Sequence, residues 1–382
     1  MTTKPQKKRY LETQLLEYSK NKIIILSGPR QVGKTTLSKQ LISDFSYYNY
    51  DIKDDFRVFQ NNEWQKDSAL VIFDELQKKK NWKLWLKGLF DEGHLKKQAI
   101  LVTGSARLDL SKKVGDSLAG RFFSYRMNPL DMKELKGSDT PLNNYQKLIT
   151  LSGFPEPFFE GTEKFYGLWK KTHSDLILRQ DGILEENIRD IDSIEILIEL
   201  LSERVGSTIS INALAEDLGK DEKTVKKWLN SLENLFIVFR INPYAKNISK
   251  AIKKSGKYYF YDTAKVRGDE SQKLENLVAL SLKKELEFLS DTEGFDLSLN
   301  FAKLRDQKEI DFLILRNKKP EKLIEVKFSD MTVSNSFKTF DRFFKSCEKI
   351  QLVKNITKEF TNTDGVKVKS CLNYLENIDF RT

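Results

Sequence analysis

Two stretches of the sequence contain side chains suited to binding a nucleoside triphosphate, and the first is "GPRQVGKT", residues 28–35. It fits the pattern G-x-x-x-x-G-K-[ST], in which a glycine-rich loop surrounds phosphate groups with its backbone. The apolar run 22–28 before it predicts a strand, and the run 34–45 after it predicts a helix. Because a P-loop requires a strand before it and a helix after it, we expect this stretch to bind ATP.

The residues of this loop have distinct expected roles. Glycines at positions 28 and 33 let the backbone curl, so that its N–H groups point at phosphate oxygens. Lys34 is expected to reach the β- and γ-phosphates, and the Thr35 hydroxyl to bind Mg²⁺. The predicted nucleotide-binding residues of the loop are Gly28, Pro29, Arg30, Gln31, Val32, Gly33, Lys34, Thr35 and Thr36. The alternative is a glycine turn that precedes a helix by chance.

The second stretch, "ALVIFDE" (69–75), ends in two carboxylates. Four apolar residues place Asp74 and Glu75 at the carboxyl end of a strand, where they would lie beside the P-loop. We expect Asp74 to hold Mg²⁺ together with Thr35, and Glu75 to act in catalysis by polarising the attacking water. Acidic strand ends are common on protein surfaces, so this prediction depends on the P-loop upstream.

A further strand, "AILVTGSA" (99–106), also ends in polar residues. Thr103 or Ser105 is predicted to sense the γ-phosphate from this strand. Arg107 and Arg121 are candidates for an arginine that contacts phosphate, either in its own chain or from a neighbouring subunit. The alternative for each arginine is an ordinary ion pair. Ser105 and Arg121 join the predicted nucleotide-binding residues.

A different chemistry is indicated by "LIEVKFSD" (323–330), where Glu325 and Lys327 stand two apart in an apolar run. Strand side chains alternate between faces, so both point the same way, while Ile324, Val326 and Phe328 point the other way. Asp311 is expected to alternate with Ile310 and Phe312 in a neighbouring strand. Carboxylates that hold a divalent metal and a lysine near the attacking water are what a metal-dependent nuclease requires. Asp311, Glu325 and Lys327 are therefore the predicted catalytic residues of a second site.

The elements that position the nucleotide-binding residues are short apolar runs separated by helical stretches. The runs 22–28, 47–52, 68–75 and 98–106 predict a parallel α/β sheet covered on both faces. A turn-rich break at 136–144 then predicts a domain boundary. The predicted domains are 1–140 for the P-loop domain, 141–256 for a helical middle region, and 257–382 for a C-terminal α/β module.

The middle region contains a segment, 209–241, with a helix, a tight turn, a second helix and an extended run. This order predicts a winged helix-turn-helix, in which Asp221 caps the second helix. The apolar face of that helix is expected to comprise Val225, Trp228, Leu229 and Leu232. Its basic residues could contact DNA phosphates, and they are Lys223, Lys226, Lys227 and, in the possible wing, Arg240. The alternative is a module that packs between domains or subunits.

Composition narrows the class of protein. The 382 residues carry a net charge of +10, which favours polyanionic partners such as nucleic acid. The two cysteines form no disulfide framework, so a reducing cytoplasm is expected. The two histidines exclude a histidine-rich metal site. No apolar run approaches the roughly 18 residues that a membrane helix needs, so no membrane partner is expected.

The order of these motifs resembles that of a family of AAA+ superfamily ATPases. The stretches that carry the resemblance include "GPRQVGKTTL", "LVIFDE", "LVTGSARL", "LAGR", "NPLDMKEL", "SGFPEP", "YFYDTAKVRG", "LENLVAL", "EIDFLI" and "IEVKFS". The resemblance implies an AAA+ P-loop sheet domain, a helical and winged-helix middle, and a C-terminal domain like the PD-(D/E)xK nucleases. It also implies a homo-oligomer, with a ring as one form. Where the family usually has two glycines, this chain has Ser152 and Gly153.

Under this resemblance, Glu275 matches the first acidic position of the nuclease pattern. The predicted metal ligands are therefore Glu275, Asp311 and Glu325 at the nuclease-like site, and Thr35 and Asp74 at the P-loop. Three interpretations of the nuclease-like site remain open: a working metal site, a nuclease-like fold without activity, or the solvated charged face of a strand.

The expected function is that of a Mg²⁺-dependent ATPase that engages or remodels DNA, branched DNA included, coupled to an endonuclease that uses Mg²⁺ or Mn²⁺. The alternative is a nucleotide-controlled switch that binds DNA or protein and whose nuclease-like tail does not cut. Metal binding by the C-terminal module distinguishes the two.

Overall fold

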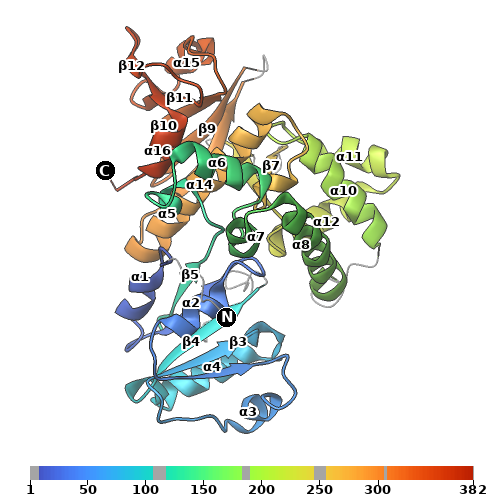
Figure 1. Cartoon of the computed structure of the whole chain (residues 1–382), viewed down its shortest axis with the longest axis vertical. Helices are drawn as coiled ribbons and strands as arrows, with labels where there is room; N and C mark the ends of the chain where they lie inside the picture. The colour runs from blue at the N-terminus through green and yellow to red at the C-terminus, as the bar shows by residue number, and fades with distance from the viewer. Residues whose placement is uncertain (1–7, 106–117, 183–189, 245–254, 305–307, 382) are drawn as a thin grey trace. The chain divides into compact units, whose positions relative to one another are not determined.

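The computed structural model of the chain describes residues 8–105, 118–182, 190–244, 255–304 and 308–381. The chain forms two compact units that divide between Asn128 and Pro129 (Figure 1). No helix in the described part of the chain combines the length and the apolar composition that crossing a bilayer demands.

The first unit is built on a five-stranded sheet whose strands all run parallel, in the order β2-β3-β4-β1-β5. The strands are β1 (Ile23–Ser27), β2 (Phe45–Asn49), β3 (Leu70–Asp74), β4 (Ala99–Gly104) and β5 (Phe122–Arg126). Its helices include α1 (Glu12–Glu17), α2 (Lys34–Gln40), α3 (Phe56–Asn61) and α4 (Trp82–Asp91). The predicted parallel α/β sheet is confirmed.

Burial explains why these strands read as continuous apolar runs. Every residue of β1, β3 and β4 is buried, as expected for the central strands of a parallel sheet covered on both faces. The edge strand β5 reads "FFSYR" and buries only Tyr125. It lacks both the apolar run and the strict alternation that identify a strand, and the sequence did not predict it.

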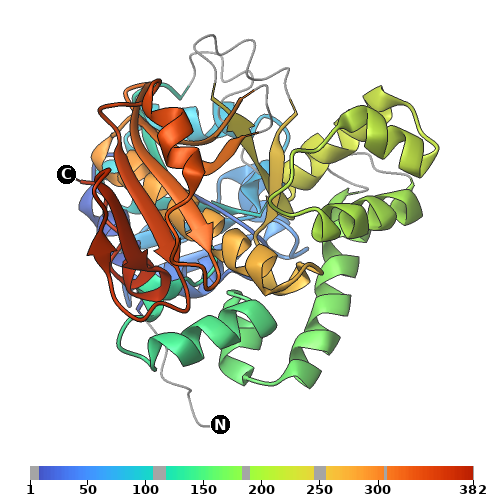
Figure 2. The same cartoon turned by 90° about the horizontal axis from the view of Figure 1, so that it is seen from above.

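The second unit contains an eight-stranded mixed sheet in the order β12-β13-β11-β10-β9-β8-β6-β7. Its strands are β6 (Val238–Pro243), β7 (Lys257–Phe260), β8 (Leu297–Lys303), β9 (Glu309–Arg316), β10 (Lys319–Lys327), β11 (Glu348–Val353), β12 (Phe360–Thr361) and β13 (Val366–Ser370). β8, β9 and β10 are antiparallel neighbours, whereas β10, β11 and β13 are parallel. Figure 2 shows the strands near the C-terminus side by side, in orange to red.

Helices cover both faces of this second sheet. The long helix α14 (Glu270–Glu293) packs on one face, and α15 (Asn335–Asp341) packs on the other. Further helices of this unit include α5 (Met132–Leu135), α6 (Pro141–Thr150), α7 (Pro155–Glu160), α8 (Glu163–Asp175), the π-helix η3 (Leu176–Gly182), α10 (Ile191–Glu203), α11 (Ile211–Leu218), α12 (Glu222–Asn234) and α16 (Cys371–Glu376). One buried apolar cluster extends from Leu130 to Phe380. The predicted middle region and C-terminal module therefore share a core.

The segment predicted as a winged helix-turn-helix, 209–241, contains α11, α12 and most of β6. β6 pairs antiparallel with β7, which lies beyond the predicted segment. The carboxylate of Asp221 accepts a hydrogen bond from the Thr224 amide (2.9 Å) and caps α12, as predicted. The predicted apolar face of α12 is buried. β6 also pairs with β8, so the hairpin extends the second sheet.

The turn before α7 contains Ser152 and Gly153. Ser152 has a φ of 78°, in the left-handed region that favours glycine. Its hydroxyl accepts a hydrogen bond from the Phe154 amide (3.3 Å). A Cβ on Gly153 would stand 2.4 Å from the Leu130 carbonyl oxygen, so only glycine fits the second position.

Candidate functional site

The P-loop joins the end of β1 to the start of α2 in a conformation that requires glycine at two positions. Gly28 has a φ of 154° and Gly33 a φ of 99°. A Cβ on Gly28 would lie 2.2 Å from the carbonyl oxygen of Met127, which follows β5. Gly28 thus permits a close approach of two backbones, and Gly33 permits the sharp turn into α2.

The ammonium group of Lys34 is held within the loop. Lys34 is buried, and its Nζ donates hydrogen bonds to the carbonyl oxygens of Gly28 (2.8 Å) and Pro29 (2.7 Å). Carbonyl oxygens are neutral acceptors, and an anionic phosphate oxygen would bind the same ammonium more strongly. The geometry therefore suits a lysine that exchanges loop carbonyls for phosphate.

Asp74, at the end of β3, is surrounded by hydroxyl groups. Its Oδ2 accepts hydrogen bonds from Thr35 (2.9 Å) and Tyr47 (2.7 Å), and its Oδ1 accepts one from Thr103. Asp74 is 4% exposed, and no lysine or arginine in the described ranges forms an ion pair with it. Burial and the nearby Asp74 carboxylate raise the pKa of Tyr47, so this hydroxyl remains a donor.

A buried carboxylate without a cation beside a threonine hydroxyl is a donor set that fits Mg²⁺, which prefers hard oxygen ligands. Thr35 and Asp74 would hold the ion, as predicted. The structure thus brings together the two residues that the sequence assigned to Mg²⁺ at the P-loop.

Glu75 lies beside Asp74 in a left-handed backbone conformation, with a φ of 55°. Its Oε2 accepts hydrogen bonds from Ser105 (3.0 Å) and Gln77 (2.6 Å). Ser105 follows β4, so two predicted residues from neighbouring strands meet at the edge where the P-loop lies. The predicted catalytic carboxylate, Glu75, and the predicted γ-phosphate sensor, Ser105, thus lie together at the carboxyl ends of the strands.

The second site is organised around Asp311, at a β-bulge in β9. Ala302 of β8 lies opposite Ile310, and Asn300 lies opposite Leu313, so two residues of β9 face one residue of β8. Ile310 consequently packs against the α15 face and Phe312 against the α14 face. The sequence predicted that both would lie on one face, and the bulge makes that prediction wrong, because an extra residue reverses the alternation.

Glu325 and Lys327 lie on one face of β10, as predicted, and Ile324 and Val326 pack on the other. Lys327 Nζ donates to Glu325 Oε1 (3.0 Å), and the Val326 amide donates to Asp311 Oδ2 (2.9 Å). Glu325 is 5% exposed, and its Oε2 has no hydrogen-bond partner among the described residues. Burial and the Asp311 carboxylate raise the pKa of Glu325 to about 7.

Glu275 is bound by residues that the sequence did not predict. Its Oε1 accepts a hydrogen bond from the Tyr259 hydroxyl (2.7 Å) and lies 3.4 Å from Lys257 Nζ. The same ammonium lies 2.5 Å from Glu309 and 3.8 Å from Asp311. Burial raises the pKa of Glu275, against the lowering effect of Lys257.

The three predicted metal ligands are therefore not gathered into one set. Across the described ranges, no three acidic, histidine or cysteine side chains are placed to hold a metal ion together. Asp311 and Glu325 could hold a single ion, because the buried Glu325 Oε2 has no hydrogen-bond partner within the described ranges. Glu275 does not join them, since Lys257 and Tyr259 occupy its oxygen.

Comparison with known protein families assigns the first site. Residues 20–136 match the AAA domain family, and residues 142–267 and 271–374 match two domain families of unknown function. The first unit contains an AAA-type P-loop ATPase domain. This part of the expected family resemblance is confirmed, whereas the families matched by the rest of the chain assign no activity to it.

The chain is also similar to uncharacterized proteins along most of its length. One, from Methanocaldococcus jannaschii, is 26% identical over 370 residues, covering 87% of this chain and 80% of the relative. Another, from Haemophilus influenzae, is 24% identical over 416 residues, covering 97% of this chain and 98% of the relative. Neither relative's name states an activity.

Solved structures resemble the chain only loosely. The Thermotoga maritima RuvB Holliday junction branch migration motor is 18% identical, with a TM-score of 0.31, over 60% of this chain and 87% of that one. The Aeropyrum pernix ORC1 protein in complex with DNA is 11% identical, with a TM-score of 0.34, over 72% and 94%. At these TM-scores the likeness carries no argument about function.

Arg121 lies at the amino ends of the strands of the AAA sheet, whereas the P-loop lies at their carboxyl ends. β5 runs parallel to β1 with Phe122 opposite Ile23, so Arg121 lies just before the point where both strands begin. The five residues of β1 rise about 3.3 Å each before the P-loop starts. Arg121 Nε donates to Asp91 Oδ1 (2.9 Å). The structure does not bring Arg121 to the P-loop of its own chain; contact with a neighbouring subunit's nucleotide stays a prediction, and Arg107 lies outside the described residues.

Sequence reasoning missed two residues that support the AAA site. Tyr47, on β2, donates to Asp74, and the buried Arg9 donates to the carbonyl oxygens of Val32 (2.6 Å) and Asn128 (2.8 Å). Tyr47 belongs to an aromatic-rich strand, and Arg9 to a basic N-terminal run. Neither position shows a motif, so only the three-dimensional contacts identify them.

The predicted DNA-contacting lysines lie on the solvent face of α12. Lys223, Lys226 and Lys227 are exposed, and none forms an ion pair with a described residue. Arg240 is partly buried on β6, and a Cβ on Gly256 would stand 2.4 Å from its Nε. Arg240 therefore packs along the β6–β7 hairpin.

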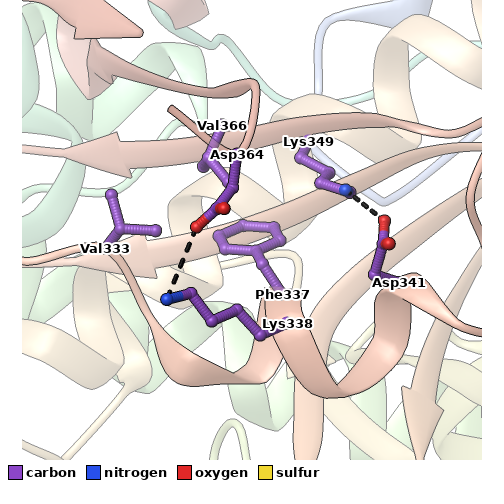
Figure 3. A pocket seen from close by; sticks show the side chains of 7 residues that line it. All are labelled: Val333, Phe337, Lys338, Asp341, Lys349, Asp364 and Val366. Carbon is purple, nitrogen blue, oxygen red and sulfur yellow. Dashed lines mark hydrogen bonds and ion pairs between the residues drawn. The ribbon is translucent and has the colours of Figure 1, made fainter. Parts of the chain in front are cut away.

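A pocket of about 250 Å³ opens on the α15 side of the second unit (Figure 3). Its apolar lining comprises Val333, Phe337 and Val366, and two ion pairs, Lys338 with Asp364 and Lys349 with Asp341, border it. Each of the four charged side chains is thus paired with one other residue that lines the pocket. The pocket contains no residue predicted for either site.

The raised pKa of Glu325 predicts how stability depends on pH in metal-free buffer. The unfolded carboxyl titrates near its ordinary value of 4.5, whereas the folded one titrates near 7. Between these values the folded state binds more protons, so the free energy of unfolding falls as pH rises. We expect Glu325→Gln to remove up to about 3 kcal/mol of this decline between pH 5 and 8.

The measurement is denaturant unfolding in EDTA at both pH values. Glu321→Gln, on the same strand, is the control for loss of a carboxylate that already pairs with Arg316 (2.5 Å). Equal declines in the parent and in Glu325→Gln would contradict the assignment of the raised pKa to Glu325.

Proposed function

We propose that this protein is a Mg²⁺-dependent ATPase that engages or remodels DNA. The observation that carries the ATPase part is the buried Asp74 carboxylate. It accepts hydrogen bonds from hydroxyl groups of the P-loop and of the strands on either side of β3. A matching AAA domain family supports the same part. The DNA part is supported by the net charge of +10 and by the exposed lysines of α12.

Each residue of the AAA site has a role in the proposed hydrolysis. Lys34 would bind the β- and γ-phosphates, and Thr35 and Asp74 would hold Mg²⁺, which neutralises charge on the phosphates. Glu75 would orient the attacking water and accept its proton, since the Ser105 and Gln77 donors fix the direction of its carboxylate.

Lys34→Ala is expected to reduce ATP turnover to background, because it removes the buried ammonium that would bind the β- and γ-phosphates. The measurement is steady-state phosphate release at saturating ATP and Mg²⁺. Lys97→Ala is the matched control, since Lys97 is exposed and precedes β4 at the opposite edge of the sheet. Full turnover by Lys34→Ala would refute the P-loop assignment.

DNA contact through α12 is proposed because its exposed lysines have the spacing of one helix face. Lys223, Lys226 and Lys227 are three and four residues apart, and the opposite face of the helix is buried. Lysines that contact phosphates release counterions from DNA, so they contribute affinity that depends on salt rather than on sequence.

The double substitution Lys226→Ala with Lys227→Ala is expected to weaken binding to all duplex sequences alike. Each lost phosphate contact lowers the slope of log K against log salt by about 1. The measurement is fluorescence anisotropy across a salt series. Lys220→Ala is the control, because Asp190 already pairs with Lys220 (2.9 Å). An unchanged slope in the double variant would favour the packing-module alternative.

The first candidate activity of the second unit is metal-dependent cleavage of phosphodiester bonds. Asp311 and Glu325 would hold one divalent ion, which would polarise the phosphate when bound. Lys327 is more exposed than its partner carboxylate, and Glu325 overcomes burial to raise the pKa of Lys327. Its ammonium therefore stays protonated and would stabilise negative charge on the phosphate rather than remove a proton from water.

Asp311→Ala is expected to abolish Mg²⁺- or Mn²⁺-dependent DNA cleavage, because it removes one of the two proposed metal ligands. It also leaves the Val326 amide without the acceptor that Asp311 provides. The measurement is a cleavage panel on linear, single-stranded and branched DNA, with and without ATP. Glu321→Ala, on β10, serves as the carboxylate control. Equal cleavage by the parent and by Asp311→Ala would point to contamination or to another site.

The second candidate function is a nucleotide-controlled switch whose second unit binds DNA or protein without cutting. The observation that favours it is the position of Lys257, whose ammonium lies among three carboxylates of the nuclease-like site. Calorimetry with Mn²⁺ separates the candidates, since metal binding at Asp311 and Glu325 is expected only for the nuclease.

A further inference from the structure

The carboxylate cluster of the second unit already contains a cation. Lys257, on β7, is 1% exposed. Its Nζ lies 2.5 Å from Glu309 Oε1, 3.4 Å from Glu275 Oε1 and 3.8 Å from Asp311 Oδ1. Three carboxylates from two elements, α14 and β9, therefore face one buried ammonium.

Such an arrangement is stable only if the charges balance one another. An ammonium taken out of water costs several kcal/mol unless carboxylates replace its hydration. Around Lys257, the carboxylates of Glu275, Glu309 and Asp311 supply this replacement. The buried ammonium therefore serves the cluster as its cation.

The groups around Lys257 are held in place by further contacts. Tyr259 donates to the same oxygen of Glu275 (2.7 Å), and a Cβ on Gly206 would stand 2.5 Å from the other oxygen. Lys303 lies 3.4 Å from the second oxygen of Glu309. The carboxylates therefore have little freedom to turn toward a different cation while Lys257 is present.

Asp311 divides the site into two halves. Its Oδ1 faces Lys257, and its Oδ2 accepts the Val326 amide beside Glu325. The half formed by Glu275 and Glu309 contains the ammonium. The other half contains Glu325, whose buried Oε2 has no partner in the described part of the chain.

We propose that Lys257 is a resident cation, which neutralises Glu275, Glu309 and Asp311 in place of a divalent metal ion. With the ammonium among them, these three carboxylates are not placed to hold a metal ion, and the same is true of every such group in the described part of the chain. The nuclease-like site then has room for at most one ion, at Asp311 and Glu325. This inference deepens the proposed function, because it sets the cation requirement of the same site, and it rests on that proposal only for the second half.

Lys257→Met tests the proposal, because methionine keeps an unbranched chain of similar length and removes the charge. The uncompensated carboxylates are expected to bind one further equivalent of Mn²⁺ relative to the parent. The measurement is isothermal titration of the full-length chain, stripped of metal and nucleotide. A thermal melt with and without Mn²⁺ should show a larger rise in Tm for Lys257→Met than for the parent.

Two control variants separate charge from packing. Lys257→Arg keeps the positive charge and should show no additional Mn²⁺ binding. Lys257→Met combined with Glu309→Gln removes the carboxylate nearest to the ammonium and should lose the additional equivalent. An additional equivalent that persists in this double variant would overturn the proposal, since the ion would then bind elsewhere.

The outcomes distinguish this inference from the nuclease proposal. No ion in the parent and one in Lys257→Met would refute the nuclease site and support the resident cation. The same number in both proteins would overturn the resident cation, whatever the nuclease panel shows. If Lys257→Met folds only with Mn²⁺, the ion replaces the lost charge and the proposal is supported. If neither Lys257→Met nor Lys257→Gln folds even with Mn²⁺, the proposal is overturned.

Discussion

Both candidate sites depend on one constraint, which is that a buried carboxylate must receive either donors or a cation. Asp74 meets this constraint with three hydroxyls and keeps no lysine or arginine partner among the described residues, so its charge remains available to Mg²⁺. Asp311 meets it with a backbone amide and a lysine, so part of its charge is already used. The same type of residue in a largely apolar strand thus has different prospects as a metal ligand, and its neighbours make the difference.

The parallel sheet of the first unit determines which residues can act together. Strands that run in one direction gather their carboxyl ends at one edge, where the P-loop, Asp74, Glu75 and Ser105 meet. Arg121 precedes a strand instead of following one, and the same geometry places it at the other edge. A role for Arg121 in the proposed hydrolysis would therefore require a neighbouring subunit, and this stays a prediction.

In the second unit, a single β-bulge has a comparable effect. The additional residue in β9 changes which face Ile310 occupies and leaves Asp311 between Lys257 and the Val326 amide. A regular strand would have followed the alternation that the sequence predicts. Bulges reorient side chains in this way where two strands have unequal numbers of residues, and an isolated sequence does not reveal the count of the partner strand.

The sequence by itself determined the P-loop, the parallel α/β sheet and the pairing of Thr35 with Asp74, because each depends on local pattern and on strand order. It also determined that Glu325 and Lys327 share a face, since strand alternation requires it. Only the tertiary structure revealed Tyr47, Arg9 and Lys257, which lie far along the chain from the groups they contact and belong to no motif. The number of cations that a cluster of carboxylates can accept depends on such distant partners, so it is a property of the folded chain.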